Sequence, residues 1–259
     1  MRTVIATRYV TPLREGGSLP AVVEADDDGL YVLKFRGAGQ GRKALIAELV
    51  AGELARAVGL PVPEIVFVQL DAELARTEPD AEIQDLIRAS AGLNLALDYL
   101  PGAVAYDPLV HRLDPDLASA IVWHDAFTTN VDRTPRNVNL LMWHRQPWLI
   151  DHGAALIVHH QWQGYLERAG SPFPMIKDHV LLARASGIAQ ADARIAAQLS
   201  VEVVTRVVDL VPDDWLEQAA EFDGPRAQRA GYVRYLMARL QPPRRFAEEA
   251  ARAGAALHL

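Results

Sequence analysis

Three oxygen-bearing side chains near the middle of the sequence have types and spacing suited to chemistry. Asp132 is followed five residues later by Asn137, and Asp151 begins the tripeptide Asp-His-Gly. A carboxylate can orient an attacking hydroxyl, and carboxylate or amide oxygens are the ligands that Mg²⁺ prefers. We expect Asp132 to take the first role and Asn137 and Asp151 the second. Phosphoryl transfer also needs a cation beside the phosphates, for which Lys34 is the candidate.

The local pattern around these residues predicts elements that would bring them together. A helix is expected from Pro115 to Phe127, followed by a polar loop over residues 130–139 that contains a proline. Two short β-like runs, 138–143 and 147–150, flank a turn at 144–146 and predict a β-hairpin. Asp151 would then lie where the hairpin ends, close to the loop that precedes it.

The first hundred residues predict a sheet with one long helix. The acidic spacer Asp26-Asp27-Asp28-Gly29 separates two β-prone runs and is a strong turn signal, so these runs are expected to form a hairpin. A glycine-rich loop over 37–41 is followed by a helix that ends before Gly59 and Pro61. The elements expected here are strands at 22–23, 31–35, 64–70 and 93–100, the helix from Lys43 to Val58, and a polar helical segment after residue 71.

Glu48 can be evaluated from helix geometry alone. At about 100° per residue, its neighbours on the helix surface are small or apolar: Ala44, Leu45, Ala51, Gly52 and Ala55. A carboxylate in such surroundings needs a cation, because burying an unpaired charge is costly. Lys34 is the candidate partner of Glu48, whereas Glu53 has Arg56 nearby as a surface partner.

A small sheet followed by a mainly helical remainder indicates an α+β fold with two lobes. We expect an N-terminal lobe at residues 1–100 and a helical C-terminal lobe at residues 101–259, with a ligand cleft between them. The connector would line an adenine site through Leu97, Tyr99 and Leu100. Ser18, in a glycine-containing loop, is a candidate phosphate contact.

The combined motifs resemble the HipA-like kinase family of the protein-kinase-like superfamily and, more distantly, the phosphatidylinositol kinases. The resemblance covers roughly residues 15–160 and is carried by YVLKF at 31–35, ELVAGELARAVGLPVP at 48–63, NVDRTPRNVN at 130–139 and WLIDHG at 148–153. It implies that Lys34 contacts the α- and β-phosphates of ATP and pairs with Glu48. It also implies that Asp132 is the catalytic aspartate and that Asn137 and Asp151 hold Mg²⁺.

The sequence departs from the family pattern in three places. It has no His-Arg-Asp motif, His152 stands where phenylalanine would stand in Asp-Phe-Gly, and there is no serine-rich phosphate loop. The leading hypothesis is an ATP- and Mg²⁺-dependent kinase that phosphorylates a protein serine or threonine or a small hydroxylated molecule. A nucleotide-binding pseudokinase that acts as a scaffold or sensor is the main alternative, and nucleotidyl transfer by the same fold is a second.

Composition limits the possible partners and the cellular location of the protein. The chain has 259 residues, and its net charge of -7 argues against a broad nucleic-acid surface. It has no cysteine, which excludes disulfides and thiolate metal sites. No apolar run reaches the roughly 20 residues needed to cross a bilayer. We therefore expect a cytoplasmic protein with no membrane partner, whose partners are ATP and an unknown hydroxyl acceptor.

Overall fold

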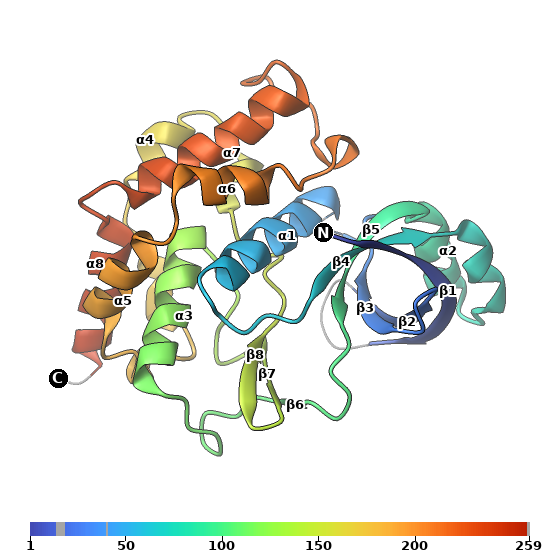
Figure 1. Ribbon diagram of the computed structural model, residues 1–259, viewed down its shortest axis with the longest axis horizontal. Coiled ribbons are helices and arrows are strands. Elements are labelled where there is room, and N and C mark those ends of the chain that lie inside the picture. Colours follow the sequence, from blue (N-terminus) through green and yellow to red (C-terminus); the bar gives the residue numbers. More distant parts are fainter. Residues whose placement is uncertain (14–18, 40, 258–259) are drawn as a thin grey trace.

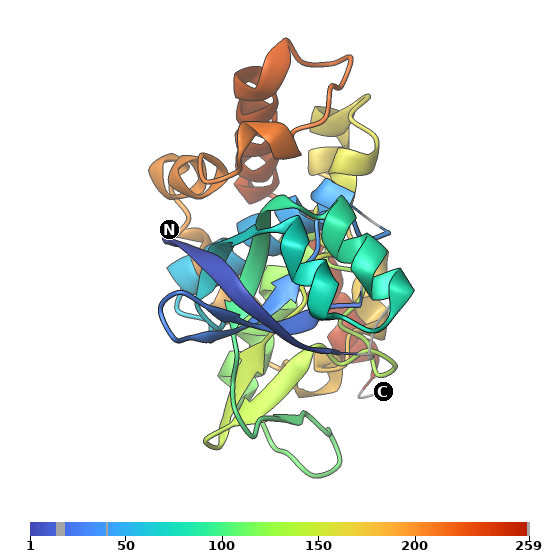
Figure 2. The same cartoon turned by 90° about the vertical axis from the view of Figure 1, so that its right-hand side faces the viewer.

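The computed structural model describes residues 1–13, 19–39 and 41–257, and it shows an N-terminal β-barrel beside a mainly helical body (Figure 1). This arrangement confirms the expected α+β fold with a β-rich beginning and a helical remainder. After a quarter turn (Figure 2), the barrel faces the viewer and the C-terminal helices extend beyond it.

Five strands form the barrel in the closed order β1-β2-β3-β5-β4. The expected hairpin is present: β2 and β3 pair antiparallel, with Val22 opposite Val32. β1 pairs antiparallel with β2 and parallel with β4, which closes the barrel. The helix α2 lies between β4 and β5 in the chain. The bounds are β1 Thr3–Pro12, β2 Ala21–Ala25, β3 Leu30–Lys34, β4 Ile65–Leu70, α2 Ala81–Ala89 and β5 Gly92–Asp98.

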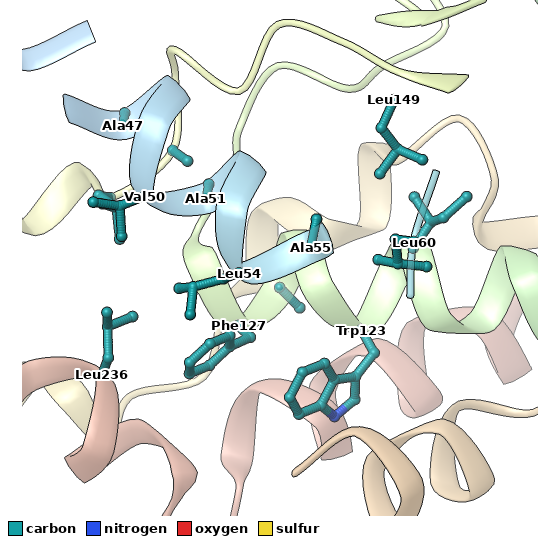
Figure 3. Close-up of a cluster of buried hydrophobic side chains, with 14 of the residues drawn as sticks. Ala47, Val50, Ala51, Leu54, Ala55, Leu60, Trp123, Phe127, Leu149 and Leu236 are labelled. Atoms are coloured by element: carbon teal, nitrogen blue, oxygen red, sulfur yellow. The ribbon is translucent and has the colours of Figure 1, made fainter. Parts of the chain in front are cut away.

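The long helix α1, Gly41–Ala57, packs mainly against the helical body. Its apolar residues belong to the same buried cluster as Trp123 and Phe127 of α3 and Leu236 of α7 (Figure 3). The barrel has a separate buried cluster, built from strand residues together with Ala75 and with Ile83 and Ile87 of α2. The helix ends as predicted, since Gly59 has a positive φ of 79°, which glycine adopts at little cost. The lobe boundary at residues 100 and 101 remains a prediction.

Helix α3, Pro115–Thr128, lies within the body and is followed in the chain by the polar loop. Asp114 caps its N-terminus by accepting from the amides of Asp116 and Leu117, and Pro115 occupies the first turn. Thr129 ends the helix in the left-handed conformation, with φ 56°. The other α-helices of the body are α4 Tyr165–Ala169, α5 Ile188–Ala196, α6 Val201–Val208, α7 Gly224–Leu240 and α8 Arg245–Ala256.

The second hairpin is formed by β7, Leu140–Trp143, and β8, Gln146–Leu149. Its turn contains two residues, His144 and Arg145, both with positive φ. The observed turn is therefore one residue shorter than the expected turn at 144–146, and β8 begins at Gln146. The short strand β6, Val104–Ala105, adds a third strand that the sequence did not predict. Among the described residues, none of the helices has the length and hydropathy required to span a bilayer.

Candidate active site

A cleft of about 1280 Å³ is lined by residues of the barrel, of α1 and of the helical body. Every candidate site residue that lies within the described residues lines it: Lys34, Glu48, Leu97, Tyr99, Leu100, Asp132, Asn137 and Asp151. Ser18 lies outside the described residues. The cleft therefore brings together side chains that are up to 117 positions apart in the sequence, from Lys34 to Asp151.

Lys34 lies between two carboxylates. Its Nζ is 2.8 Å from Oδ1 of Asp151 and 3.7 Å from Oε2 of Glu48. The ammonium group comes from the last residue of β3, Glu48 from the middle of α1, and Asp151 from the turn two residues after β8. The ion pair expected between Lys34 and Glu48 is thus present, and a second pair links Lys34 to the candidate metal ligand.

The burial of these three side chains falls steadily from Glu48 to Asp151. The Glu48 side chain is 2% exposed, Lys34 12% and Asp151 37%. Burial by itself would raise the pKa of Glu48, but Lys34 and His152 together outweigh it, so the pKa falls to about 2. Burial likewise would lower the pKa of Lys34, and the carboxylates of Glu48 and Asp151 raise it instead. Both members of the Lys34–Glu48 pair are therefore charged at neutral pH.

His152 provides a further contact to Glu48. Its ring is fully buried, and Nδ1 lies 3.5 Å from Oε1 of Glu48. Neither ring nitrogen has a hydrogen-bond partner among the described residues, and neither Glu48 oxygen has one. The residue that replaces phenylalanine in the Asp-x-Gly motif therefore brings a polar ring against the helix glutamate.

Asp132 lies in a network of amide groups. The side-chain amide of Asn137 donates to its Oδ2 at 2.6 Å, and that of Asn139 donates to the same oxygen at 3.3 Å. Asn130 accepts from the backbone amide of Asp132 at 3.1 Å. Because the Asn137 nitrogen is turned toward Asp132, its amide oxygen is left to face another group.

The base of the hairpin β7–β8 holds Asn139, which contacts Asp132, near Asp151. Asn139 immediately precedes β7 and Asp151 follows β8 by two residues, and the amide of Ile150 donates to the carbonyl of Asn139 at 3.1 Å. Both Asn139 and Asp151 adopt positive φ, 49° and 56°. Asn and Asp tolerate this left-handed conformation better than most residues. The hairpin therefore holds the loop and the Asp-His-Gly turn side by side.

A buried ion pair anchors the loop to α3. Asp125 is fully buried and accepts from Nε of Arg133 at 2.6 Å, from Asn130 at 3.1 Å and from His179 at 2.9 Å. Arg133 also donates to the carbonyls of Asn139 and Ile150. Burial opposes ionisation of Asp125, but Arg133, His124 and His179 together lower its pKa well below the usual range. Arg133, the residue next to Asp132, is therefore bonded both to α3 and to the base of the hairpin β7–β8.

Sequence reasoning missed several residues of this site. Asp125, Arg133 and His179 carry no spacing signal, because they are joined only through the folded structure. Val32, Leu140 and Ile150 add apolar surface to the cleft. Val32 could have been found, since it lies two residues before Lys34 on the same strand and therefore faces the same side.

The chemistry of the donor set fits a divalent cation of the Mg²⁺ type. Asp151 offers a carboxylate and Asn137 an amide oxygen, and both line the same cleft as Asp132. Among the described residues, no group of three or more histidine, cysteine, aspartate or glutamate side chains is placed to hold a metal. Mg²⁺ is usually held by one or two carboxylates together with phosphates and water, so such a cage is not required.

Comparison with known proteins identifies related folds. The structure is similar to a proinflammatory kinase of Helicobacter pylori, CtkA, with a TM-score of 0.58 and 13% identity, covering 98% of this chain and 99% of that one. It is also similar to the Golgi casein kinase with Mn and ADP bound, with a TM-score of 0.51 and 11% identity, covering 99% of this chain and 72% of that one. At these identities the likeness establishes the fold alone.

No curated protein matches the sequence. The family model described as HipA-like kinase matches residues 7–247, which is nearly the whole chain. The match extends well beyond the stretch of about 15–160 that carries the motifs, so it includes most of the helical body. This protein belongs to the HipA-like kinase family.

Proposed function

We propose that the protein is an ATP- and Mg²⁺-dependent kinase that transfers the terminal phosphoryl group to a hydroxyl acceptor, either a protein serine or threonine or a small molecule. The observation that carries the proposal is the convergence of Lys34, Asp132, Asn137 and Asp151 on one cleft. A cation, a carboxylate beside the acceptor position and two oxygen ligands are the parts that phosphoryl transfer requires.

Each residue has a distinct role in this proposal. Asp132 accepts the proton of the acceptor hydroxyl, while Asn137 and Asn139 hold its carboxylate in place. Lys34 contacts the α- and β-phosphates, and Glu48 keeps the ammonium group oriented toward them. Asn137 and Asp151 would hold Mg²⁺, which supplies charge neutralisation at the phosphates. The rate enhancement comes from positioning and electrostatics, without a covalent enzyme intermediate.

The position of the nucleotide follows from the lining of the cleft. Leu97, Tyr99 and Leu100 line it, and we propose that they enclose the adenine ring together with Val32. The Golgi casein kinase structure contains Mn and ADP, which supports a nucleotide and a divalent cation in this chain as well. In this arrangement the phosphates extend from the connector toward Lys34 and Asp151.

Calorimetric titration with ATP, with and without Mg²⁺, tests the proposal on the intact protein and on two variants. Asp151→Ala should lose the part of ATP affinity that depends on Mg²⁺. Asp132→Asn should still bind ATP with Mg²⁺, but phosphoryl transfer should fall by a factor on the order of 10² to 10⁴. Asp178→Ala, an exposed aspartate outside the cleft, is the matched control and should behave as the intact protein.

Two results would contradict this assignment. Absence of ATP binding to the intact protein at millimolar concentration would rule out both a kinase and a nucleotide-binding scaffold. Binding that depends on Mg²⁺, combined with a biological activity that Asp132→Asn leaves unchanged, would instead indicate the pseudokinase alternative.

A further inference from the structure

The cleft has an excess of negative charge. The described residues that line it include six carboxylates, Glu48, Glu78, Asp80, Asp98, Asp132 and Asp151, and two cations, Lys34 and Arg136. A triphosphate adds further negative charge, so each cation in the cleft matters for binding. Lys34 is already engaged by Glu48 and Asp151 at 3.7 and 2.8 Å.

Arg136 differs from Lys34 in having no hydrogen-bond or ion-pair partner within the part of the chain that the structure describes. Its side chain is exposed, and no hydrogen bond or ion pair joins it to another of the described residues. The neighbouring Arg133, by contrast, is buried, and its Nε and Nη1 donate to Asp125 and to the carbonyls of Asn139 and Ile150. The loop thus contains one structural arginine and one whose five N–H donors are unpaired with respect to residues 1–13, 19–39 and 41–257.

The backbone holds Arg136 in a defined place. Thr134 and Asn137 exchange two hydrogen bonds, N to O at 3.0 Å and 3.1 Å, which leaves Pro135 and Arg136 as a two-residue turn. Pro135 restricts the backbone of this turn further. Asn137, the next residue, is bonded to Asp132 at 2.6 Å. Arg136 is therefore presented to the cleft beside the residues assigned to the acceptor and the metal.

We propose that Arg136 binds the terminal phosphoryl group of the nucleotide and makes the site selective for nucleoside triphosphates over diphosphates. A guanidinium can pair with two phosphoryl oxygens at once, which suits a group whose charge is spread over three oxygens. Lys34 lines the same cleft, and the resemblance assigns it to the α- and β-phosphates. This inference rests on the proposed function and adds the residue that recognises the transferred group.

The test is the equilibrium affinity for the imido analogue of ATP and for ADP, each with Mg²⁺, measured by calorimetry. Arg136→Ala should weaken binding of the analogue about tenfold, the effect of losing one charge-assisted contact, and change ADP binding less than about twofold. Arg136→Lys keeps the charge but not the paired donors, so its affinity for the analogue should lie between those of the intact protein and of Arg136→Ala.

Arg145→Ala is the matched control, because Arg145 is also an exposed arginine in a two-residue turn, at the tip of the next hairpin, and does not line the cleft. It should change neither affinity. An equal loss of analogue and ADP affinity in Arg136→Ala, or no loss of either, would overturn the assignment of Arg136. Failure of the intact protein to bind either nucleotide would instead refute the proposed function, so the two failures can be distinguished.

Discussion

At the scale of single residues, Lys34 bridges two carboxylates of the cleft, one on α1 and one after β8. Its ammonium group lies 2.8 Å from Asp151 and 3.7 Å from Glu48, so the two carboxylates compete for one cation. If Glu48 loses its charge, Lys34 is held by Asp151 alone. In the proposed function, the carboxylate of Asp151 would then be less available to Mg²⁺, and Lys34 would be less well placed for the phosphates.

Glu48→Gln should therefore weaken Mg²⁺-dependent ATP binding by about tenfold, as expected for the loss of one charge-assisted contact. Since the pKa of Glu48 is about 2, its carboxylate is ionised at all working pH values, and the effect should be the same at pH 6 and pH 8. Calorimetry at both pH values provides the measurement.

Glu53→Gln is the control on the same helix, because Glu53 pairs at 3.4 Å with Arg56, away from the cleft. It should leave nucleotide affinity unchanged. Equal affinities for the intact protein and Glu48→Gln would show that Glu48 does not position Lys34.

At the scale of elements, local sequence patterns predicted individual helices and strands but not how distant strands pair. The helix around Glu48 could be placed from its spacing, and its small neighbours have a structural reason: a Cβ at Gly52 would lie 2.5 Å from Cδ1 of Ile65, so a larger residue would press against β4. The parallel pairing of β1 with β4 could not be predicted, because Thr3 and Phe67 meet only in the folded barrel.

In the candidate site, too, some residues could be predicted from local spacing and others could not. Asp132, Asn137 and Asp151 follow a spacing that can be recognised in a sequence, whereas Arg136 is one of 26 Lys and Arg residues and no pattern distinguishes it. The partnership of Asp125 with His179 spans 54 positions and depends on how α3 packs. Residues that act through tertiary contacts leave no periodic signal, so the structure was needed to find them.

Helix α7 supplies an arginine that supports the end of α3. Arg239 is buried, and its guanidinium donates to the carbonyls of Ala126 and Phe127 at 2.8 Å and to that of Ala169 at 3.1 Å. The last carbonyls of a helix lack partners within it, so this side chain satisfies groups that would otherwise be unpaired just before the loop of Asp132.

Arg239→Met should destabilise the protein by about 3 kcal/mol, because it leaves several buried carbonyls without a donor. The free energy of unfolding in urea measures this. Arg234→Ala, an exposed arginine of the same helix, should change it by no more than about 0.5 kcal/mol. A loss of similar size in the two variants would show that Arg239 contributes nothing specific to the end of α3.

At the scale of the whole molecule, the two lobes are unequal in how they are built. The barrel has its own apolar cluster, whereas α1 shares the large cluster of the helical body (Figure 3). Glu48 and Asp151 therefore belong to the body, and Lys34 extends to them from the barrel strand β3. A change in the angle between the barrel and the body would have to stretch or break these ion pairs, which couples the geometry of the cleft to the state of Lys34.

The stability of the body should depend on pH through a buried histidine. His159 is 1% exposed, and its Nδ1 lies 3.0 Å from the hydroxyl of Tyr232 on α7. Burial disfavours the charged ring, and the nearby His160 and Lys43 add repulsion, so the pKa of His159 falls to about 3. In the unfolded chain the ring has an ordinary pKa near 6.5, so the unfolded state binds a proton that the folded state does not between pH 6.5 and pH 3.

Stability contributed by the neutral ring is therefore complete above pH 6.5 and decreases as the pH falls toward 3. For this group alone, the free energy of unfolding should drop by about 2 kcal/mol between pH 7 and pH 5. His159→Gln should remove that part of the pH dependence, measured as the difference between urea unfolding curves at the two pH values. His144→Gln, which replaces an exposed histidine, should retain the full dependence. If His159→Gln shows the same loss between pH 7 and pH 5 as the intact protein, His159 is not kept neutral by the fold, and the pH response of the body must come from other groups.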